Sequence, residues 1–313
     1  MIGEKKILWV EEFRPKTVKD CILPDRLKKT FQEYVDRKEV PNLILSGSPG
    51  TGKTTVAMAM CEEIGLDYIL LNGSEENGID TMRVKVKGFA SSVSLTGGRK
   101  VIIFDEADYL TPLAQAALRG VIEEFAGNCS FIFTCNLLNR LIEPLHSRTA
   151  VINFKLTGAE KSGMASQFFK RVEYILNFKN IAYDSKVVAE VVMKFFPDYR
   201  RILNELQKHS VSGPIDASVL AQVGDVSLTE LFVSLRAKDF KSIRKWVGTH
   251  TDSDSQKIMR DIYDKLSEYV APQSIPAAVV LLGRYQYQAA FVVDQEINLM
   301  AFLTELLVEC EFR

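Results

Sequence analysis

The stretch that decides the fold is Gly47-Ser48-Pro49-Gly50-Thr51-Gly52-Lys53-Thr54. It fits the pattern G-x-x-x-x-G-K-[ST], whose glycines let the backbone turn tightly and present N–H groups to phosphate oxygens. The apolar run Leu43–Leu45 before it indicates a buried strand, and the run Thr55–Cys61 after it indicates a helix. Because strand, loop and helix follow in the order that the motif requires, we favour a phosphate-binding loop over a chance glycine-rich turn.

The chemistry of this loop predicts a nucleoside triphosphate as its ligand. Lys53 is expected to reach the β- and γ-phosphates, and the Thr54 hydroxyl to ligate Mg²⁺. The helix that begins near Lys53 points its positive end at the same anions. The loop residues that we expect to bind ATP are Gly47, Ser48, Pro49, Gly50, Thr51, Gly52, Lys53, Thr54 and Thr55.

A second apolar run, Val101–Phe104, ends in Asp105 and Glu106. Asp105 is expected to hold Mg²⁺ directly or through water, and Glu106 to act as the general base on the attacking water. The alternative is an acidic pair that only caps the next helix. The letters D-E-A-D also suggest the DEAD-box helicases, but the next apolar run ends in Thr134-Cys135-Asn136 instead of a Ser-Ala-Thr type motif.

Composition limits the classes of function. Of 313 residues, 47% are hydrophobic and 25% are charged, which is typical of a soluble globular protein. The net charge of −1 means that a nucleic-acid surface must concentrate its basic residues locally. The five cysteines lack C-x-x-C spacing and favour a reduced compartment. We find no apolar signal core and no run long enough to span a bilayer, so we expect no membrane partner and a cytoplasmic location, in the host cell if a phage encodes the chain.

Between residues 41 and 154, short β-rich runs alternate with helical stretches. This alternation predicts an α/β fold, in which helices cover both faces of a parallel sheet. Phosphate ligands then bind at the carboxyl ends of the strands. The expected strands are Leu43–Ser46, Tyr68–Asn72, Val101–Asp105, Phe131–Thr134 and Val151–Phe154.

The rest of the chain is predicted to be helical. We expect three domains, with residues 1–155 forming the α/β domain and residues 156–225 and 226–313 forming two all-helical domains. The second boundary is placed at Gly224-Asp225, which has the composition of a hinge. The terminal helix, Glu296–Leu307, is rich in apolar positions, which suit either the core of one chain or packing against a neighbouring subunit.

Smaller motifs give a resemblance to the AAA+ ATPases, and within them to sliding-clamp loader subunits of the replication factor C type. Thr134-Cys135-Asn136 resembles sensor 1, which implies that Asn136 contacts the γ-phosphate and water. Ser147-Arg148-Thr149 is similar to the Ser-Arg-Cys motif of clamp loaders, with a threonine in place of the usual cysteine. The resemblance implies that Arg148 acts in trans on the ATP of a neighbouring subunit.

Three further segments extend this resemblance over residues 7–205. Pro197-Asp198-Tyr199-Arg200-Arg201 resembles sensor 2 of the lid domain, which implies that Arg200 contacts the phosphates bound by its own subunit. Residues 9–16 resemble the W-x-E-K-Y-R-P segment that wraps the adenine, and residues 114–119 resemble the family's A-Q-N-A-L-R helix. The short chain, without zinc cysteines near the loop, is more similar to the bacteriophage members than to the cellular ones. The implied adenine-side residues are Val10, Glu11, Glu12, Phe13 and Ile22.

A basic helix is expected from Gly78 to Lys87, with Arg83 and Lys87 four residues apart on one face. In the family that the chain resembles, this helix follows one strand of primer–template DNA by contacts to phosphates. Phosphate contacts are independent of sequence and sensitive to salt, which suits a protein that acts at any primer end. The alternative is a solvated basic face without a partner.

The resemblance implies an ATPase subunit of a sliding-clamp loader. ATP binding with Mg²⁺ would open the clamp and bind primer–template DNA, and hydrolysis would release the closed clamp for processive replication. Implied partners are the clamp, other loader subunits in a hetero-oligomer (a pentamer in the family), primer–template DNA and, indirectly, the replicative polymerase. The alternative is another AAA+ DNA remodeller, such as a branch-migration helicase or an origin loader. We disfavour a small-molecule kinase because of the trans-arginine motif, and a non-hydrolysing scaffold because Lys53, Asp105 and Glu106 are all present.

Overall fold

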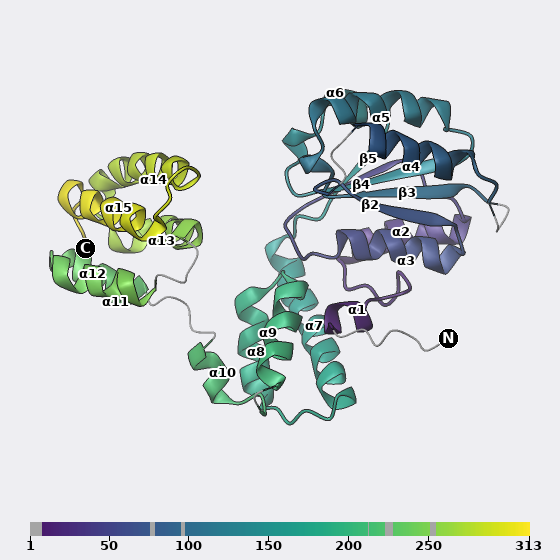
Figure 1. Cartoon of the computed structure of the whole chain (residues 1–313). Coiled ribbons are helices and arrows are strands. Elements are labelled where there is room, and N and C mark those ends of the chain that lie inside the picture. Colours follow the sequence, from purple (N-terminus) through teal and green to yellow (C-terminus); the bar gives the residue numbers. More distant parts are fainter. Residues whose placement is uncertain (1–7, 76–78, 95–97, 212, 223–227, 251–254) are drawn as a thin grey trace. The chain divides into compact units, whose positions relative to one another are not determined.

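The structure is a computed structural model that describes residues 8–75, 79–94, 98–211, 213–222, 228–250 and 255–313. It divides into two compact units, residues 1–222 and residues 223–313. We call them unit 1 and unit 2 and describe each by itself (Figure 1).

Unit 1 contains a five-stranded sheet in the order β2-β3-β4-β1-β5, in which every pairing is parallel. The predicted α/β fold and its strands are confirmed, with two strands at the expected bounds and the others shifted by one or two residues at one or both ends. Because Asn72 pairs with Asp105 and Ser46 with Cys135, the carboxyl ends of these strands reach one edge together. The strands are β1 (Leu43–Ser46), β2 (Tyr68–Asn72), β3 (Lys100–Asp105), β4 (Cys129–Cys135) and β5 (Ala150–Asn153).

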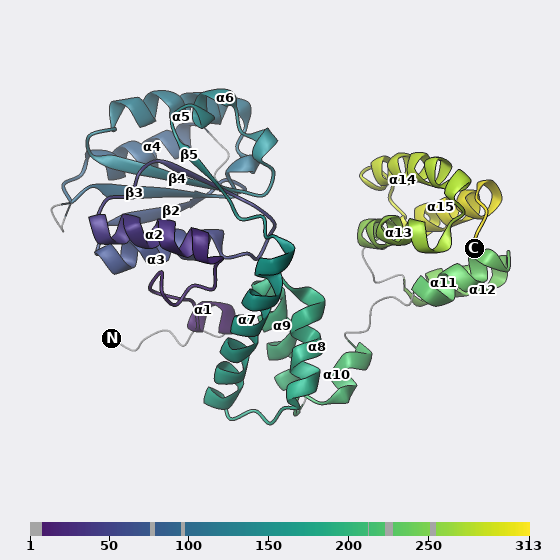
Figure 2. The ribbon, with the colours of Figure 1, turned by 180° about the vertical axis from the view of Figure 1, so that it is seen from behind.

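Helices cover both faces of this sheet (Figures 1 and 2). The helices α2 (Asp25–Arg37) and α3 (Lys53–Ile64) pack on one face, where Phe31 and Met60 are fully buried. On the other face lie α4 (Ile79–Ser91), α5 (Pro112–Glu124) and α6 (Glu143–His146), above the stacked rings of Phe104 and Phe133. A sheet that is covered on both faces has strands that are apolar throughout. Burial of each large apolar side chain stabilises the folded state by about 1.5–3 kcal/mol.

The chain then forms a helical lid from α7 (Gly158–Phe178), α8 (Ser185–Phe195), α9 (Tyr199–Ser210) and α10 (Ala217–Gln222). Side chains that bond the free N–H groups set the starts of these helices, with Thr157 capping α7, Asp184 capping α8 and Asp198 capping α9. The short helix α1 (Trp9–Glu12) packs against α9, and the Trp9 N–H donates to Gln207 Oε1 at 2.8 Å. The N-terminal segment therefore belongs to the lid side of unit 1.

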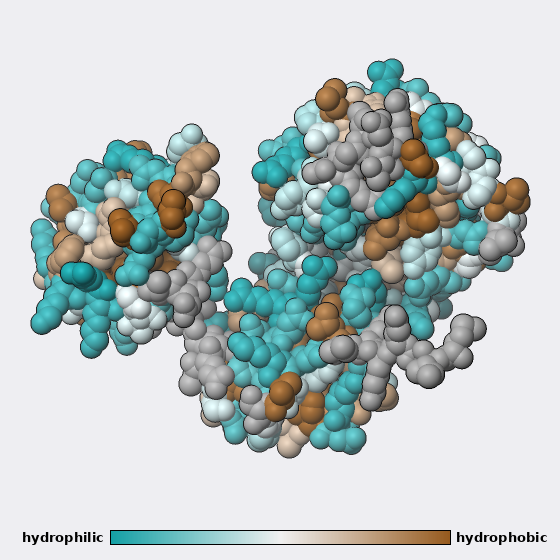
Figure 3. Space-filling model, in the orientation of Figure 1, coloured by the Kyte–Doolittle hydropathy of each residue, from teal (hydrophilic) through white to brown (hydrophobic). Residues whose placement is uncertain are grey.

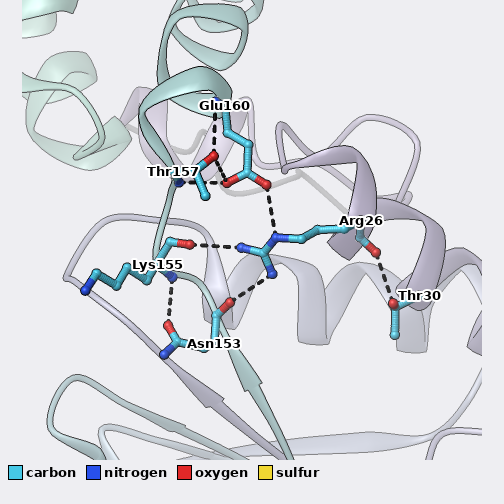
Figure 4. Close-up of polar contacts among 6 residues, drawn as sticks. All are labelled: Arg26, Thr30, Asn153, Lys155, Thr157 and Glu160. Carbon is cyan, nitrogen blue, oxygen red and sulfur yellow. Dashed lines mark hydrogen bonds and ion pairs between the residues drawn. The ribbon is translucent and has the colours of Figure 1, made fainter.

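One arginine connects the α/β part of unit 1 to the lid (Figure 4). Arg26, in the first turn of α2, donates to Glu160 Oε1 at 3.0 Å and to the carbonyl oxygens of Lys155 at 2.9 Å and Asn153 at 3.4 Å. Glu160 also accepts from the backbone N–H and the hydroxyl of Thr157, which completes a capping box at the start of α7. The end of β5, the start of α2 and the start of α7 thus meet at one guanidinium.

Unit 2 is all helical and has its own core, in which Leu231, Trp246, Leu281 and Phe302 are buried. Its terminal helix packs against α12 and α14 and contributes buried side chains to that core. Whether the outer face of this helix also meets a neighbouring subunit stays a prediction. The helices are α11 (Leu228–Arg236), α12 (Phe240–Thr249), α13 (Ser255–Tyr269), α14 (Ile275–Ala289) and α15 (Gln295–Glu309).

The surface that Figure 3 shows is mostly hydrophilic, with hydrophobic residues in small groups between polar ones. All five cysteines are buried and free of disulfides. Within the described ranges, none of the helices has the length and apolar content that a membrane span requires.

Candidate nucleotide-binding site

A cavity lies at the carboxyl ends of β1, β3 and β4, between the glycine-rich loop and the lid helices α7 and α9. Most of the residues predicted to bind or hydrolyse the nucleotide line it. Glu11, Glu12, Gly47, Ser48 and Arg148 do not. Those that do are Val10, Phe13, Ile22, Pro49, Gly50, Thr51, Gly52, Lys53, Thr54, Thr55, Asp105, Glu106, Asn136 and Arg200.

Lys53 is the central cation of this cavity. Its Nζ donates to the carbonyl oxygens of Gly47 at 2.7 Å and Ser48 at 2.8 Å, and to Asn136 Oδ1 at 2.9 Å. Burial lowers the pKa of Lys53, while the nearby Asp105 and Asp108 carboxylates act in the opposite direction. Gly47 and Ser48 thus hold the lysine through their backbone, and Lys53 connects the loop to the end of β4.

The loop needs glycine where it meets the lid. Gly50 and Gly52 have φ values of +73° and +88°, in the left-handed region that favours glycine. A Cβ on Gly50 would overlap the Asp198 carboxylate and lie 3.0 Å from the Asp198 Cα, so a larger residue there would force the start of α9 to shift. The Tyr199 N–H donates to the Gly50 carbonyl at 3.1 Å. The loop and the first turn of α9 are therefore in direct contact.

The two carboxylates at the end of β3 have different environments. Asp105 Oδ1 accepts from the Thr54 hydroxyl at 2.6 Å and from the Thr134 hydroxyl at 2.5 Å. Glu106 has a φ of +54°, and its N–H donates to Thr134 Oγ1 at 3.1 Å. One hydroxyl therefore orients both acidic residues. The Thr54 hydroxyl and the Asp105 carboxylate lie side by side and supply oxygen atoms only, a donor set that fits Mg²⁺.

Asp108 supports the site from behind, a role that the sequence did not reveal. This residue lies in the short 3₁₀-helix η1 (Ala107–Tyr109) and is 6% exposed. Its Oδ2 accepts from the N–H groups of Asn136 at 3.2 Å and Leu137 at 3.1 Å, which fixes the end of β4. The fourth letter of D-E-A-D was the one signal in the sequence for this residue, although not for what it binds.

A group of apolar side chains lines the side of the cavity nearer the lid. Val10, Phe13 and Ile22 line it together with Phe168 and Ile175 of α7. Two polar contacts order this wall, since the Tyr199 hydroxyl donates to the Ile22 carbonyl at 3.3 Å and Arg171 Nη2 donates to the Phe13 carbonyl at 3.1 Å. Such a wall suits a flat aromatic base.

The acidic residues beside Phe13 point elsewhere. Glu12 forms an ion pair with Lys179 at 2.6 Å, and Glu11 forms one with Arg14. Arg14 and Arg171 line the cavity but were not among the predicted site residues. Arg14 is the arginine of the segment that resembles W-x-E-K-Y-R-P, which was a signal for it, whereas Arg171 occurs in no motif recognised in the sequence.

Arg148 lies outside this cavity, just before β5. One oxygen of Glu123, on α5, accepts from Arg148 Nε at 3.0 Å and from Nη2 at 2.5 Å. Arg148 Nη1 donates to the Pro144 carbonyl at 2.9 Å and to the Ser147 hydroxyl at 3.0 Å. The guanidinium lowers the pKa of Glu123 mainly by this hydrogen bonding. The chain thus does not bring Arg148 to its own nucleotide cavity.

The two predicted DNA-binding residues lie on α4. Lys87 forms an ion pair with Glu124 at 2.9 Å, and both side chains are about half exposed. The backbone of Arg83 belongs to α4, while its side chain falls outside the described part of the chain. The prediction of a DNA surface therefore stays a prediction.

Comparison with known families gives the class of protein first. Residues 43–156 match the family described as "ATPase family associated with various cellular activities (AAA)". Residues 160–221 match "Sliding-clamp-loader large subunit, AAA+ ATPase lid domain". The fold and the cavity described above are thus those of an AAA ATPase.

Individual relatives narrow this class. The "Sliding-clamp-loader large subunit" of Enterobacteria phage T4 is 35% identical, with 100% of this chain and 99% of that protein covered. The "Replication factor C small subunit" of Sulfurisphaera tokodaii is 31% identical, with 97% and 96% covered. The chain belongs to the family of sliding-clamp-loader ATPase subunits.

A solved structure supports the fold alone. The RuvB Holliday junction branch migration motor of Thermotoga maritima gives a TM-score of 0.54 at 18% identity, covering 86% of this chain and 85% of that chain. The branch-migration alternative thus shares the AAA fold, but this level of identity carries no argument about function.

Proposed function

We propose that this chain is the ATPase subunit that drives a sliding-clamp loader. ATP binding promotes clamp opening and primer–template binding, and hydrolysis releases the closed clamp on DNA. The observation that carries the proposal is that Lys53, Thr54, Asp105 and Asn136 converge in one cavity under a lid of the clamp-loader type. The similarity to clamp-loader subunits over the full length of the chain supports it.

In this proposal the residues of the cavity divide the work of phosphoryl transfer. Lys53 and Asn136, already hydrogen-bonded to each other, hold the γ-phosphate in line with the attacking water. Glu106 accepts the proton of that water as it attacks. Thr54 and Asp105 would hold Mg²⁺, which neutralises charge on the phosphates when bound.

The lid side supplies recognition and coupling. Val10, Phe13 and Ile22 enclose the adenine, and Glu11 and Glu12 hold that segment through their ion pairs with Arg14 and Lys179. Arg200 contacts the phosphates from α9, next to the Gly50 contact that joins loop and lid. A nucleotide bound to the loop would therefore act on the first turn of α9 through these two contacts.

Arg148 is proposed to act in trans, completing the site of a neighbouring subunit. This fits its position outside the cavity of its own chain and the rate effect of an arginine supplied by a partner. The partners that we propose are the clamp, further loader subunits in a pentamer, primer–template DNA at Arg83 and Lys87, and indirectly the polymerase. We also propose the domain division at residues 155 and 225 and a cytoplasmic site of action, in the host cell if a phage encodes the chain.

The test is ATPase activity of the assembled loader with neither, either or both of primer–template DNA and a sliding clamp. We expect the highest turnover with both present, and no turnover in the Lys53→Ala assembly. A four-way DNA junction without a clamp is the matched substrate for the branch-migration alternative. Turnover that responds to the junction but not to clamp and primer–template would replace the clamp-loader proposal.

A further inference from the structure

Gly73, the first residue after β2, touches the backbone of Glu106. Its N–H donates to the Asp105 carbonyl at 2.8 Å, which continues the pairing of β2 with β3 by one residue. An ideal Cβ on Gly73 would lie 2.6 Å from the Glu106 carbonyl oxygen, 3.2 Å from its carbonyl carbon and 3.3 Å from the Asp105 carbonyl oxygen. Real Cβ atoms do not approach backbone atoms so closely, so only glycine fits without a shift.

The shape of the Gly73 backbone is not the reason for the glycine. Its φ lies outside the left-handed region that marks Gly50 and Gly52. An alanine could adopt this backbone conformation, and its only fault would be the contact of its methyl group with the Glu106 peptide. Glycine is therefore needed at position 73 because the two backbones approach closely, and not because the backbone adopts a conformation that only glycine favours.

Glu106 depends on its backbone for its orientation. At a φ of +54° it is in a region that costs a non-glycine residue about 1–2 kcal/mol, and surrounding contacts must hold it there. Thr134 Oγ1 accepts its N–H at 3.1 Å, and its carbonyl accepts the Tyr109 N–H at 3.0 Å. Gly73 packs against the same peptide from the β2 side.

We propose that Gly73 is a positioning residue for ATP hydrolysis, because its missing side chain lets the backbone directly after β2 pack against the Glu106 peptide and hold the carboxylate where it meets the water. This inference rests on the role proposed for Glu106. An alanine methyl would displace the Glu106 peptide by several tenths of an ångström, and errors of this order slow reactions that depend on alignment. Nucleotide binding, which uses Lys53 and the loop, would be spared.

The experiment compares the assembled loader carrying Gly73→Ala with the wild type, with Glu106→Gln and with the double variant. We expect Gly73→Ala to lower kcat about 10- to 100-fold while the dissociation constant for ATP changes less than about twofold. In the Glu106→Gln background the same change should lower the residual turnover no further, because the group that it positions is gone. The control is Gly163→Ala, an exposed position of α7 where a Cβ meets nothing within 4 Å.

Melting temperature and ATP binding are measured on every variant. A Gly73→Ala protein that fails to fold, or loses ATP affinity as much as turnover, would show a structural role and overturn the inference. Wild-type turnover in Gly73→Ala, or an additive loss in the double variant, would overturn it as well. Normal turnover in Glu106→Gln would instead remove the proposed general base, so the two failures are distinguishable.

Discussion

The cavity at the edge of the sheet and the segment around Arg148 both carry a cation bound by several groups, yet they differ in what they serve. Lys53 is 7% exposed and is bound by the loop and by Asn136, so its partners and its proposed target lie in one place. Arg148 is bound by Glu123 on the surface, and the cavity of its own chain does not include it. One region is assembled within a single chain, whereas the other needs a second chain to have the proposed role.

This difference tells us where substitutions should act. Changes in the cavity should harm every subunit by itself, and they should persist whatever the neighbour contributes. Changes at Arg148 should harm only the ATP site of the neighbouring subunit.

The largest effect is expected for Lys53→Ala. Removing this lysine should reduce both ATP binding and turnover to undetectable levels, because Lys53 is the cation that the loop and Asn136 hold against the β- and γ-phosphates. Filter binding of labelled ATP and phosphate release measure the two effects. Lys29→Ala, an exposed lysine of α2, is the control. Near-normal turnover in Lys53→Ala would refute the phosphate-loop assignment.

Arg148→Ala should keep ATP binding but slow turnover about 10³-fold, because the transition-state charge loses its partner. Mixing Arg148→Ala subunits with Glu106→Gln subunits should restore part of the activity, since some sites then combine an intact donor with an intact acceptor. Arg119→Ala is a matched control, because Arg119 also faces Glu123, at 3.9 Å. If subunits exchange without any recovery, Arg148 does not act in trans.

Glu106→Gln should lower turnover about 10²-fold or more and leave ATP affinity intact, because an amide cannot take the proton of the attacking water. Single-turnover kinetics and equilibrium binding separate the two quantities. A folded Glu106→Gln protein that no longer binds ATP would contradict the assignment of a general base and place this residue among the binding groups.

The smallest effect is expected at the DNA surface. Replacing Arg83 and Lys87 by alanine should weaken primer–template binding equally for all sequences and reduce the slope of log K against log salt by about 0.9 for each phosphate that the protein no longer neutralises. Fluorescence anisotropy over a series of salt concentrations measures the slope. Lys29→Ala, on the helix layer at the other face of the sheet, is the control. An unchanged slope in the double variant would direct attention to another surface.

Much of the fold could be predicted because its signals are local. The runs Leu43–Ser46 and Tyr68–Asn72 are strands at their expected bounds. At the start of α5, Thr111 caps the helix and Pro112 occupies its first position, where proline is favoured. The all-helical character after residue 156 was equally clear. Capping residues in the sequence indicate where helices begin, and Thr157 and Asp198 do cap α7 and α9.

The site could be predicted only where a motif names its own residues. Lys53 and Asp105 belong to such motifs, whereas Thr134 bonds Asp105 and Glu106 only because β3 and β4 pair with Phe104 beside Phe133. The register of pairing depends on both strands, so the sequence of one strand does not determine it. Arg171 reaches the cavity through the packing of the lid, and no local pattern could have placed it there.

The contacts of Arg26 have a mechanical consequence for the lid. With 21 residues, α7 is a rigid rod about 30 Å long, and Arg26 grips it at one end. For a rod of that length, a swing of about 5° at the base moves the far end by roughly 3 Å. The bonds of this one guanidinium therefore limit how far α7 can tilt about its first turn. The displacement of the far end of α7 depends on how firmly they hold that turn.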